Sequence, residues 1–309
     1  MEIRKSTLED IPEIVSVLRQ SLGESLLPKS QELWKWKHQD NPFGPSPVLL
    51  ALENNKIVGV RAFLRWDFSN QSDSIRSCRA VDTAVHPDYQ GKGIFTKLTL
   101  KLIEEVRNEG LDLIFNTPNA QSTPGYLKMG WEKSGQLPLF LGLRFAKKSK
   151  VLVPDSDWNE VRDLVKKLEL TPPKGQKFTT QVKPGYFAWR YENCPLFPYY
   201  FVSDGEKYLL VYRIKEGKWG KEFRICDFFT SENLSKTKAK ELQSDLRNAI
   251  QHSDCRLISF SGLRPNQDLG LGFLPKLSLG PLVTFRQIKH GFVPKEHEWA
   301  WSIGDLEVF

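Results

Sequence analysis

The sequence contains no apolar run that approaches the length of a membrane span. A helix that crosses a bilayer needs about 20 consecutive apolar residues. The first residues, Met1-Glu-Ile-Arg-Lys-Ser6, also lack the apolar core of a secretory signal. We therefore expect a protein of the cytoplasm that does not associate with membranes.

Cysteine and histidine are scarce and scattered. The four cysteines form no C-x-x-C pair, and the five histidines have no metal-ligand spacing. Free thiols in a reducing compartment are the simplest interpretation of such cysteines. The sequence therefore predicts neither a disulfide framework nor a metal site. The cysteines are Cys78, Cys194, Cys226 and Cys255.

The net charge is +7, so the chain does not repel acidic ligands. A nucleotide cofactor, a nucleic acid or an anionic surface would all suit this charge. The lysines, however, are spread along the chain, and no nucleic-acid-binding module is visible. We therefore expect an acidic small molecule rather than nucleic acid as the ligand.

One stretch reads as a strand, a glycine turn and a helix. Val81, Thr83 and Val85 are β-branched and predict a strand that ends at Pro87. Gln90-Gly91-Lys92-Gly93 follows as a short turn. Free N–H groups at a helix N-terminus attract an anion, and glycine lets a phosphate come close to the backbone. The turn is therefore predicted to hold a pyrophosphate. Apolar residues then recur at helical spacing: Phe95, Leu98, Leu102, Ile103 and Val106.

Local signals predict the other elements of the first half. Apolar spacing and capping residues favour helices, and alternating apolar runs beside turn residues favour strands. We expect helices over 11–18, 30–38 and 125–128, a hairpin of strands 48–52 and 57–64, and strands over 111–115 and 137–145.

The second half of the chain repeats the order of the first. Trp189-Arg-Tyr-Glu-Asn-Cys-Pro195 echoes Trp36-Lys-His-Gln-Asp-Asn-Pro42, and Arg224 and Asp227 match Arg79 and Asp82. We expect two copies of one α/β unit, 1–149 and 150–309. The second copy has Ser231-Glu-Asn-Leu-Ser-Lys236 in place of the glycine turn, and Glu232 would repel a phosphate.

The segment Val85-His-Pro-Asp-Tyr-Gln-Gly-Lys-Gly-Ile-Phe95 resembles the phosphate loop of the GNAT superfamily of acyl-CoA-dependent N-acyltransferases. Phe95 departs from the small residue that usually ends that loop. A second family element is similar to Asn119-Ala-Gln-Ser-Thr-Pro-Gly-Tyr-Leu-Lys-Met-Gly-Trp131. The resemblance implies two GNAT-like units, each a mixed, mostly antiparallel twisted sheet flanked by helices. The first would be the catalytic unit, and the degenerate second would shape the acceptor site or an interface.

The resemblance also implies acetyl-CoA as the cosubstrate and assigns residues to it. The backbone of Thr83, Ala84 and Val85 would lie against the pantetheine and acetyl group. Asn119 would bond the pantetheine arm or, alternatively, cap a helix. The pyrophosphate would be held by the N–H groups of Gln90, Gly91, Lys92, Gly93, Ile94, Phe95 and Thr96.

Two residues are candidates for the chemistry. Tyr126 matches the tyrosine that protonates the departing thiolate in many family members; alternatively, it packs against the strand. Asp82 lies on the predicted strand before the glycine turn. Partial burial could raise its pKa so that it accepts the proton of the amine. The recurrence of Asp227 in the copy without a glycine turn favours a structural role for Asp82 instead.

The function that follows is transfer of an acetyl or acyl group to the primary amine of a small-molecule acceptor, with amino sugars as one guess. Two alternatives remain at this stage. One is a protein or peptide N-acyltransferase, and the other is a non-catalytic regulatory protein that binds acyl-CoA. The sequence leaves open whether the protein is a monomer or a homodimer.

Overall fold

The computed structural model describes residues 1–23, 28–144, 152, 154–173, 175–218, 220–262, 269–272, 274–289 and 294–306. The chain divides into two compact units. One comprises Met1–Gly135 and Leu282–Glu296, and the other comprises Gln136–Pro281 and His297–Val308. The predicted boundary at 149/150 falls within residues 145–151, which lie outside the described residues.

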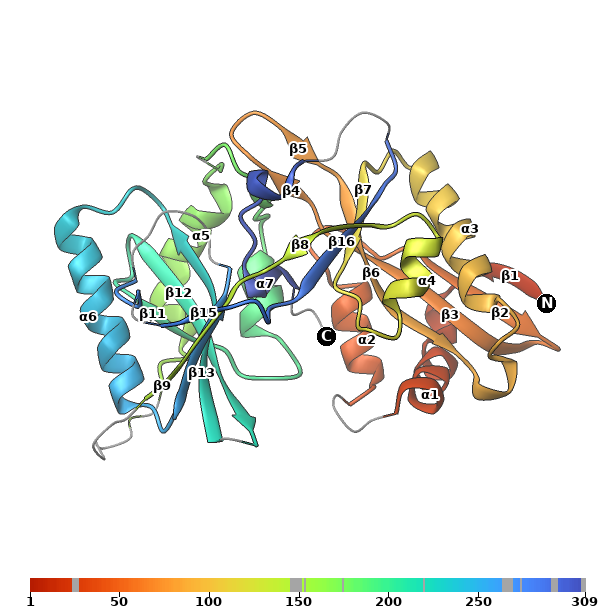
Figure 1. The fold of residues 1–309 in the computed structure, drawn as a ribbon, viewed down its shortest axis with the longest axis horizontal. Coiled ribbons are helices and arrows are strands. Elements are labelled where there is room, and N and C mark those ends of the chain that lie inside the picture. Colours follow the sequence, from red (N-terminus) through yellow and green to blue (C-terminus); the bar gives the residue numbers. More distant parts are fainter. Residues whose placement is uncertain are drawn as a thin grey trace. The chain divides into compact units, whose positions relative to one another are not determined.

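The first unit is built on a seven-stranded sheet of order β1-β2-β3-β6-β7-β16-β8 (Figure 1). Most pairings described in it are antiparallel, and β6 and β7 are parallel. The strands are β1 (Glu2–Lys5), β2 (Val48–Glu53), β3 (Lys56–Arg65), β6 (Ser77–Val85), β7 (Leu113–Asn116), β8 (Glu132–Gln136) and β16 (Leu282–Gln287), with a small hairpin of β4 (Phe68–Ser69) and β5 (Ser74–Ile75). The helices are α1 (Ile11–Leu22), α2 (Gln31–His38), α3 (Ile94–Asn108) and α4 (Thr123–Lys128).

Alternation along β2 and β3 gives this sheet two apolar faces. Leu49, Ala51 and Phe63 pack with apolar residues of α3, whereas Leu50 and Val60 pack with those of α1. The helix α3 therefore covers one face and α1 the other. Trp34 of α2 belongs to the α1 cluster, and Tyr126 of α4 belongs to the α3 cluster.

The second unit has a six-stranded sheet of order β11-β12-β13-β14-β9-β15. Among the described strands of this unit, β13 and β14 form the parallel pair, which follows an antiparallel hairpin as in the first unit. The strands are β9 (Leu139–Leu143), β11 (Tyr200–Ser203), β12 (Tyr208–Gly217), β13 (Gly220–Thr230), β14 (Leu257–Ser261) and β15 (Lys276–Leu277). The other elements are β10 (Thr179–Thr180) and the helices α5 (Arg162–Leu170), α6 (Lys236–His252) and α7 (Ile303–Leu306).

The two units exchange one strand each along the chain. β9 comes from the N-terminal half but pairs with β14 and β15, while β16 comes from the C-terminal half and pairs with β7. The units therefore differ from the consecutive segments 1–149 and 150–309. The predicted fold class, two α/β units with mixed and mostly antiparallel sheets, is confirmed.

Most predicted elements of the first half are confirmed. The hairpin of β2 and β3 turns at Asn54 and Asn55, which both have positive φ. The strand expected over 137–145 is shorter: β9 ends at Leu143, and Phe145 lies outside the described residues.

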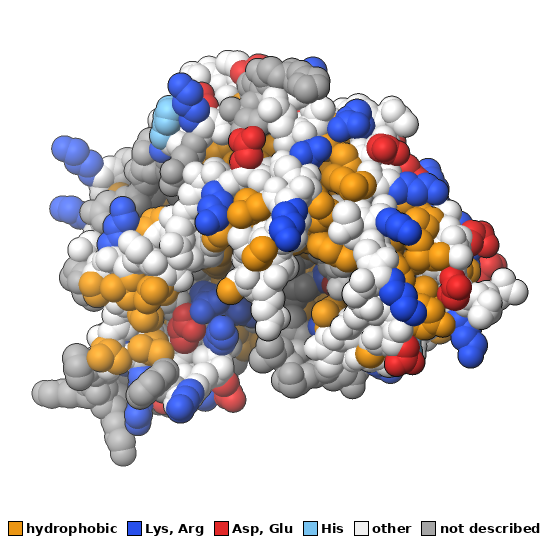
Figure 2. Space-filling view, turned by 45° about the vertical axis from the view of Figure 1, so that its right-hand side comes forward, with side chains coloured by type: hydrophobic (Ala, Val, Ile, Leu, Met, Phe, Trp, Pro, Cys, Tyr) orange, Lys and Arg blue, Asp and Glu red, His pale blue; other side chains and the backbone are white. Residues whose placement is uncertain are grey.

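The structure can be compared with the sequence for disulfides, membrane-spanning helices, metal clusters and surface charge. No disulfide joins any two of the four cysteines. Among the described residues, no helix is long and apolar enough to span a bilayer, and no cluster of acidic, histidine or cysteine side chains could hold a metal ion. Lysine and arginine side chains are scattered over the face shown in Figure 2, among acidic and apolar ones. That the protein resides in the cytoplasm and binds no nucleic acid stays a prediction.

Candidate active site

A bulge in β6 sets the direction of Asp82. Arg61 of β3 pairs with Thr83 and Ala62 pairs with Val81, so Asp82 is the extra residue between them. Its φ is 41°, a left-handed value that aspartate tolerates better than most residues. Before the bulge, Cys78 and Ala80 face α3. Simple alternation would turn Asp82 the same way, but the bulge sends its carboxylate to the opposite face, toward α2.

On that face Asp82 meets two consecutive residues of α2. Lys37 Nζ lies 2.9 Å and His38 Nε2 lies 2.8 Å from the same oxygen, Oδ2. Both partner side chains are only 2% exposed. The other imidazole nitrogen, Nδ1, lies 2.9 Å from Ser46 Oγ. The aspartate is thus fixed in a network of four polar side chains.

This network reverses the predicted shift of the Asp82 pKa. Burial by itself raises the pKa, but the Lys37 ammonium and the His38 hydrogen bond together hold it well below its usual range. The raised pKa expected from the sequence is therefore wrong, and Asp82 is an anion at neutral pH. An aspartate held so firmly as an anion is a poor proton acceptor.

Burial also acts on the partners of Asp82. It lowers the pKa of His38, although the hydrogen bond to Asp82 opposes this, so the imidazole is neutral. A neutral ring whose Nε2–H donates to the carboxylate accepts at Nδ1 from the Ser46 hydroxyl. Burial lowers the pKa of Lys37 as well, and the charge of Asp82 opposes that shift.

The neutral state of His38 predicts a pH dependence of stability. In the unfolded chain a histidine takes up a proton below about pH 6.5, whereas the buried ring resists protonation. The free energy of unfolding should therefore fall as the pH drops below about 6.5, by up to about 1.4 kcal/mol per pH unit. His38→Gln, which keeps a donor and an acceptor, should remove this slope in denaturant titrations between pH 7 and pH 5.

The control for this prediction is His252→Gln. His252 lies on α6, outside the network, and bonds the Asn248 carbonyl. That variant should keep the slope of the wild-type protein. A slope that persists unchanged in His38→Gln would contradict the assignment.

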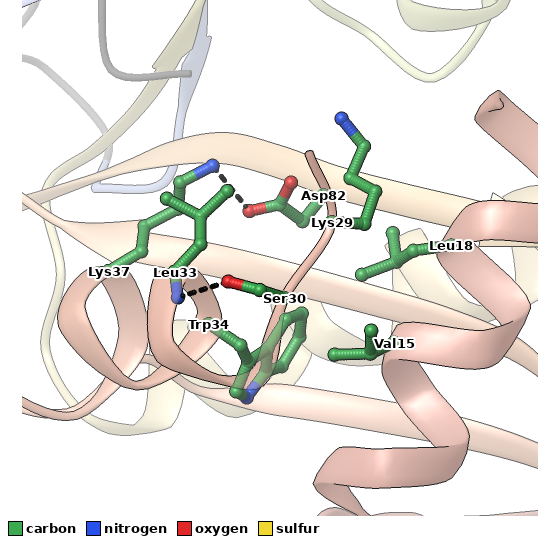
Figure 3. A pocket seen from close by; sticks show the side chains of 8 residues that line it. All are labelled: Val15, Leu18, Lys29, Ser30, Leu33, Trp34, Lys37 and Asp82. Carbon is green, nitrogen blue, oxygen red and sulfur yellow. Dashed lines mark hydrogen bonds and ion pairs between the residues drawn. The ribbon is translucent and has the colours of Figure 1, made fainter. Parts of the chain in front are cut away.

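A pocket opens beside the network, and Figure 3 shows Lys29 and Asp82 together at one side of it. It contains about 250 Å³ of empty space, including the part open to solvent. Its walls combine apolar and charged groups from α1, from α2 and the two residues before it, and from β6. The lining residues are Val15, Leu18, Lys29, Ser30, Leu33, Trp34, Lys37 and Asp82.

The glycine turn lies at the end of β6, where the structure brings the predicted phosphate residues together. Gly91 and Gly93 have φ values of 75° and 72°, which favour glycine, and a Cβ on either would meet no atom within 4 Å. Gly93 precedes α3 and provides no side-chain cap for its first turn. The N–H groups of Ile94, Phe95 and Thr96 therefore have no partner within the helix.

Gln90 connects this turn to the residues that precede it through two hydrogen bonds. Its backbone N–H donates to the Pro87 carbonyl, and its Nε2 donates to the Val85 carbonyl at 3.2 Å. Lys92 Nζ lies 4.6 Å from the centre of the Tyr89 ring. The Gln90 side chain thus links the turn to β6. Its backbone N–H already donates to Pro87, whereas the sequence predicted that this group would bind the pyrophosphate.

The strand β6 carries an unpaired backbone edge, residues 80–85, which we call the open edge. Its ladder with β7 comprises Ser77, Cys78 and Arg79, and in the described residues it continues no further. On its other side β6 stays paired with β3 through Val85. Thr83, Ala84 and Val85 therefore lie on a strand edge that offers backbone donors and acceptors.

Tyr126 lies on the α3 face. Its side chain is 5% exposed, and its hydroxyl accepts a 3.0 Å hydrogen bond from Arg61 Nη1. The ring meets Phe95 edge to face. Gly125 explains the unusual Phe95, because a Cβ there would lie 3.3 Å from the Phe95 ring.

Asn119 caps the turn before α4. Its Oδ1 accepts from the Ser122 N–H and hydroxyl, and its carbonyl accepts from Thr123. The N-cap of α4 is Ser122, so the Asn119 oxygen atoms stabilise the preceding turn and do not cap the helix itself. A role toward the pantetheine arm stays a prediction and would fall to its Nδ2 group.

The second unit keeps the aspartate but not the turn. Tyr191, the counterpart of His38, donates to Asp227 Oδ2 at 3.0 Å. The helix α6 is capped by the Ser235 side chain, and Lys207 and Glu232 form an ion pair before it. The structural role of the aspartate is therefore common to both units, whereas the uncapped turn occurs in the first.

Three residues of this site are not evident from the sequence patterns. Lys37 and His38 stand inside the repeated tryptophan segment, and their counterparts Arg190 and Tyr191 are also buried. Arg61 interrupts an apolar strand, which is itself a signal of function. Charged residues placed within buried elements were the available clue.

Comparisons with known proteins agree with this geometry. Residues 2–134 match the family model of the acetyltransferase (GNAT) domain. Over 104 residues the chain is 31% identical to L-amino acid N-acyltransferase MnaT of Escherichia coli K12 and to the L-methionine sulfoximine/L-methionine sulfone acetyltransferase of Salmonella typhimurium LT2. Each match covers 33% of this chain and 58% of the relative, so this chain spans little more than half the length of either.

Two solved structures share the fold over nearly the whole chain. A probable N-acyltransferase from Enterococcus faecalis V583 superposes with a TM-score of 0.67 at 13% identity, covering 93% of this chain and 72% of that one. A putative acetyltransferase from Pyrococcus horikoshii gives a TM-score of 0.54 at 15% identity, covering 99% and 94%. At these identities the likeness concerns the fold.

Proposed function

We propose that this chain, whose residues 2–134 match the acetyltransferase (GNAT) domain, transfers an acyl group from acetyl-CoA or another acyl-CoA to the primary amine of a small acceptor. The observation that carries the proposal is the open edge of β6, which leads directly to the uncapped glycine turn before α3. A strand edge suits the amide groups of a pantetheine arm, and uncapped N–H groups suit a pyrophosphate. Both lie in the first unit.

The chemistry divides between the two faces of the sheet. Acyl-CoA supplies an activated thioester, which a free amine attacks directly. On the α3 face the Tyr126 hydroxyl gives a proton to the departing thiolate. On the α2 face Asp82, held as an anion by Lys37 and His38, attracts the amine to the bulge beside Thr83. In this proposal Asp82 orients the acceptor and does not act as the base.

The pocket favours a particular class of acceptor. The Asp82 carboxylate suits an amine, Lys29 suits an anionic group, and Val15, Leu18 and Trp34 suit an apolar body. We infer an amine that also carries a carboxylate, such as an apolar amino acid. The names of the two curated relatives support this class. An amino sugar, which is polar and lacks a carboxylate, matches the lining less well.

The test is release of coenzyme A thiol with paired acceptors. Leucine and isoamylamine differ by the carboxylate alone. We expect leucine to be the better acceptor, and Lys29→Ala to raise its KM about tenfold, since loss of one charge-assisted hydrogen bond is worth about 1.5 kcal/mol. The same substitution should leave the KM for isoamylamine unchanged.

The matched control is Lys35→Ala, which removes an exposed lysine from α2, outside the pocket. Its KM values should equal those of the wild-type protein. Equal effects of Lys29→Ala on both acceptors would refute the carboxylate assignment. Absence of thiol release with every amine tested would refute acyl transfer itself.

A further inference from the structure

A buried arginine lies where the proposed reaction releases its thiolate. Arg61, in the middle of β3, is 0% exposed. Its Nη1 donates to the Thr83 hydroxyl and, at 3.0 Å, to the Tyr126 hydroxyl. Within the described residues its Nε and Nη2 are buried and have no hydrogen-bond partner.

Aromatic rings surround this guanidinium. Its central carbon lies 4.8 Å from the ring centre of Phe63, 5.6 Å from that of Phe95 and 5.4 Å from that of Tyr126. No ion pair of Arg61 with a carboxylate is found among the described residues. Ring faces offset part of the charge, but a buried cation without a counter-ion remains unfavourable.

The fold itself does not require this arginine. Matching Asp82 with Asp227 makes Phe228 the counterpart of Thr83, and Phe228 pairs with Leu210 as Thr83 pairs with Arg61. The second unit therefore has leucine at this position of the same ladder. The arginine occurs in the unit that carries the glycine turn, so a ligand of that unit is what can supply the missing anion.

We propose that Arg61 is a positioning residue that acts through Tyr126 to stabilise the thiolate of coenzyme A as it leaves. The inference rests on the proposed function. As the C–N bond forms, the C–S bond breaks and its electron pair stays on sulfur. The Tyr126 hydroxyl proton passes to that sulfur, and Tyr126 regains a proton from water, which also takes up the proton lost by the amine.

The geometry fits a transfer of the phenol proton from Tyr126 to the sulfur, with Arg61 on the opposite side of the hydroxyl. Because Arg61 donates to the Tyr126 oxygen, the phenol hydrogen is left to point at another acceptor. Arg61 is the charged group that contacts this hydroxyl in the described structure, and the ring neighbours of Tyr126 are Phe95 and Trp131. The guanidinium therefore polarises the phenol toward a negatively charged sulfur.

The test compares coenzyme A with desulfo-coenzyme A, which has hydrogen in place of the thiol, by calorimetric titration at pH 7 and pH 9. Thiols ionise near pH 8.5, so the thiolate fraction rises over this range. In the wild-type protein we expect the preference for coenzyme A over the desulfo analogue to grow about fivefold from pH 7 to pH 9. In Arg61→Met the preference should not change with pH.

Three further variants fix the interpretation. Arg61→Lys keeps the charge and should keep part of the pH-dependent preference, whereas Tyr126→Phe breaks the relay and should abolish it. Arg65→Met, the control on the same strand, removes an arginine that bonds the Pro45 carbonyl and Glu109, and should behave as wild type. Methionine suits the aromatic surroundings, so we expect Arg61→Met to fold; if it does not, Arg61→Lys and Tyr126→Phe decide.

The outcomes separate this inference from its premise. A wild-type preference that is equal at both pH values would overturn the role of Arg61, as would an Arg61→Met or Tyr126→Phe variant that retains the full wild-type pH dependence. Failure of both ligands to bind the wild-type protein would overturn the proposed function and this inference with it.

Discussion

Replacement of Asp82 with alanine should lower the free energy of unfolding by about 3–5 kcal/mol, the usual consequence of leaving a buried charge without its partner. Lys37 is 2% exposed and its ammonium would lose the carboxylate 2.9 Å away. His38 would lose its acceptor as well. Urea or guanidinium titration at pH 7 measures the change.

The double variant Asp82→Ala/Lys37→Met supplies the control. Removing both members of a buried ion pair costs far less than removing one, because no unpaired charge remains. The double variant should therefore recover most of the lost stability, to within about 1–2 kcal/mol of wild type. It should nevertheless remain a poor catalyst, because the proposed anchor for the amine is absent. A double variant as unstable as the single one would show that Lys37 is not the cause.

Replacement of Gly93 with valine should abolish acetyl-CoA binding in practical terms, with a loss of affinity of at least about 100-fold. The φ of 72° is unfavourable for a β-branched residue by about 1–2 kcal/mol, so the turn must change shape to relieve it. Several N–H groups at the start of α3 would then move away from the phosphate position together. Calorimetric titration with acetyl-CoA measures the loss.

Gly205→Val is the matched control for this prediction. Gly205 has a φ of 76° in a turn of the second unit, so valine meets a similar backbone penalty there. That variant should lose a similar amount of stability and keep the affinity of the wild-type protein. Equal losses of affinity in the two variants would point to general destabilisation instead of a phosphate site.

Local sequence signals were enough for the scaffold of this site. The β-branched residues of β6, the two glycines before α3 and the asparagine turn between β2 and β3 each dictate nearby backbone. Such signals act over a few residues, and the backbone at these positions has the predicted conformation. The family resemblance added Tyr126, whose burial against Phe95 agrees with a site position.

The direction of Asp82 could not be predicted in the same way. Alternation along β6 places it with Cys78 and Ala80, and a single extra residue in the ladder reverses it. A bulge depends on how β3 and β6 pair, which neither strand reveals by itself. The wrong prediction for the pKa of Asp82 has the same origin. Lys37 and His38 can contact the carboxylate only on the face toward which the bulge turns it.

The exchange of β9 and β16 between the two units was also not evident from the sequence. β9 and β16 occupy equivalent positions in their two sheets, each next to the strand that forms the parallel pair. The choice depends on tertiary pairing and on the path of the chain, which short strands such as these do not reveal by themselves. A boundary read from the order of the repeat therefore falls in the wrong place for β9 and β16.

Amide hydrogen exchange with and without coenzyme A tests the central claim most directly, because it reports where the ligand lies along the backbone. We expect protection of residues 80–85 of β6 and 91–96 of the turn and α3, with no change in β13, the equivalent strand of the second unit. Exchange in β6 that does not change at saturating coenzyme A, or equal protection of β13, would contradict the account.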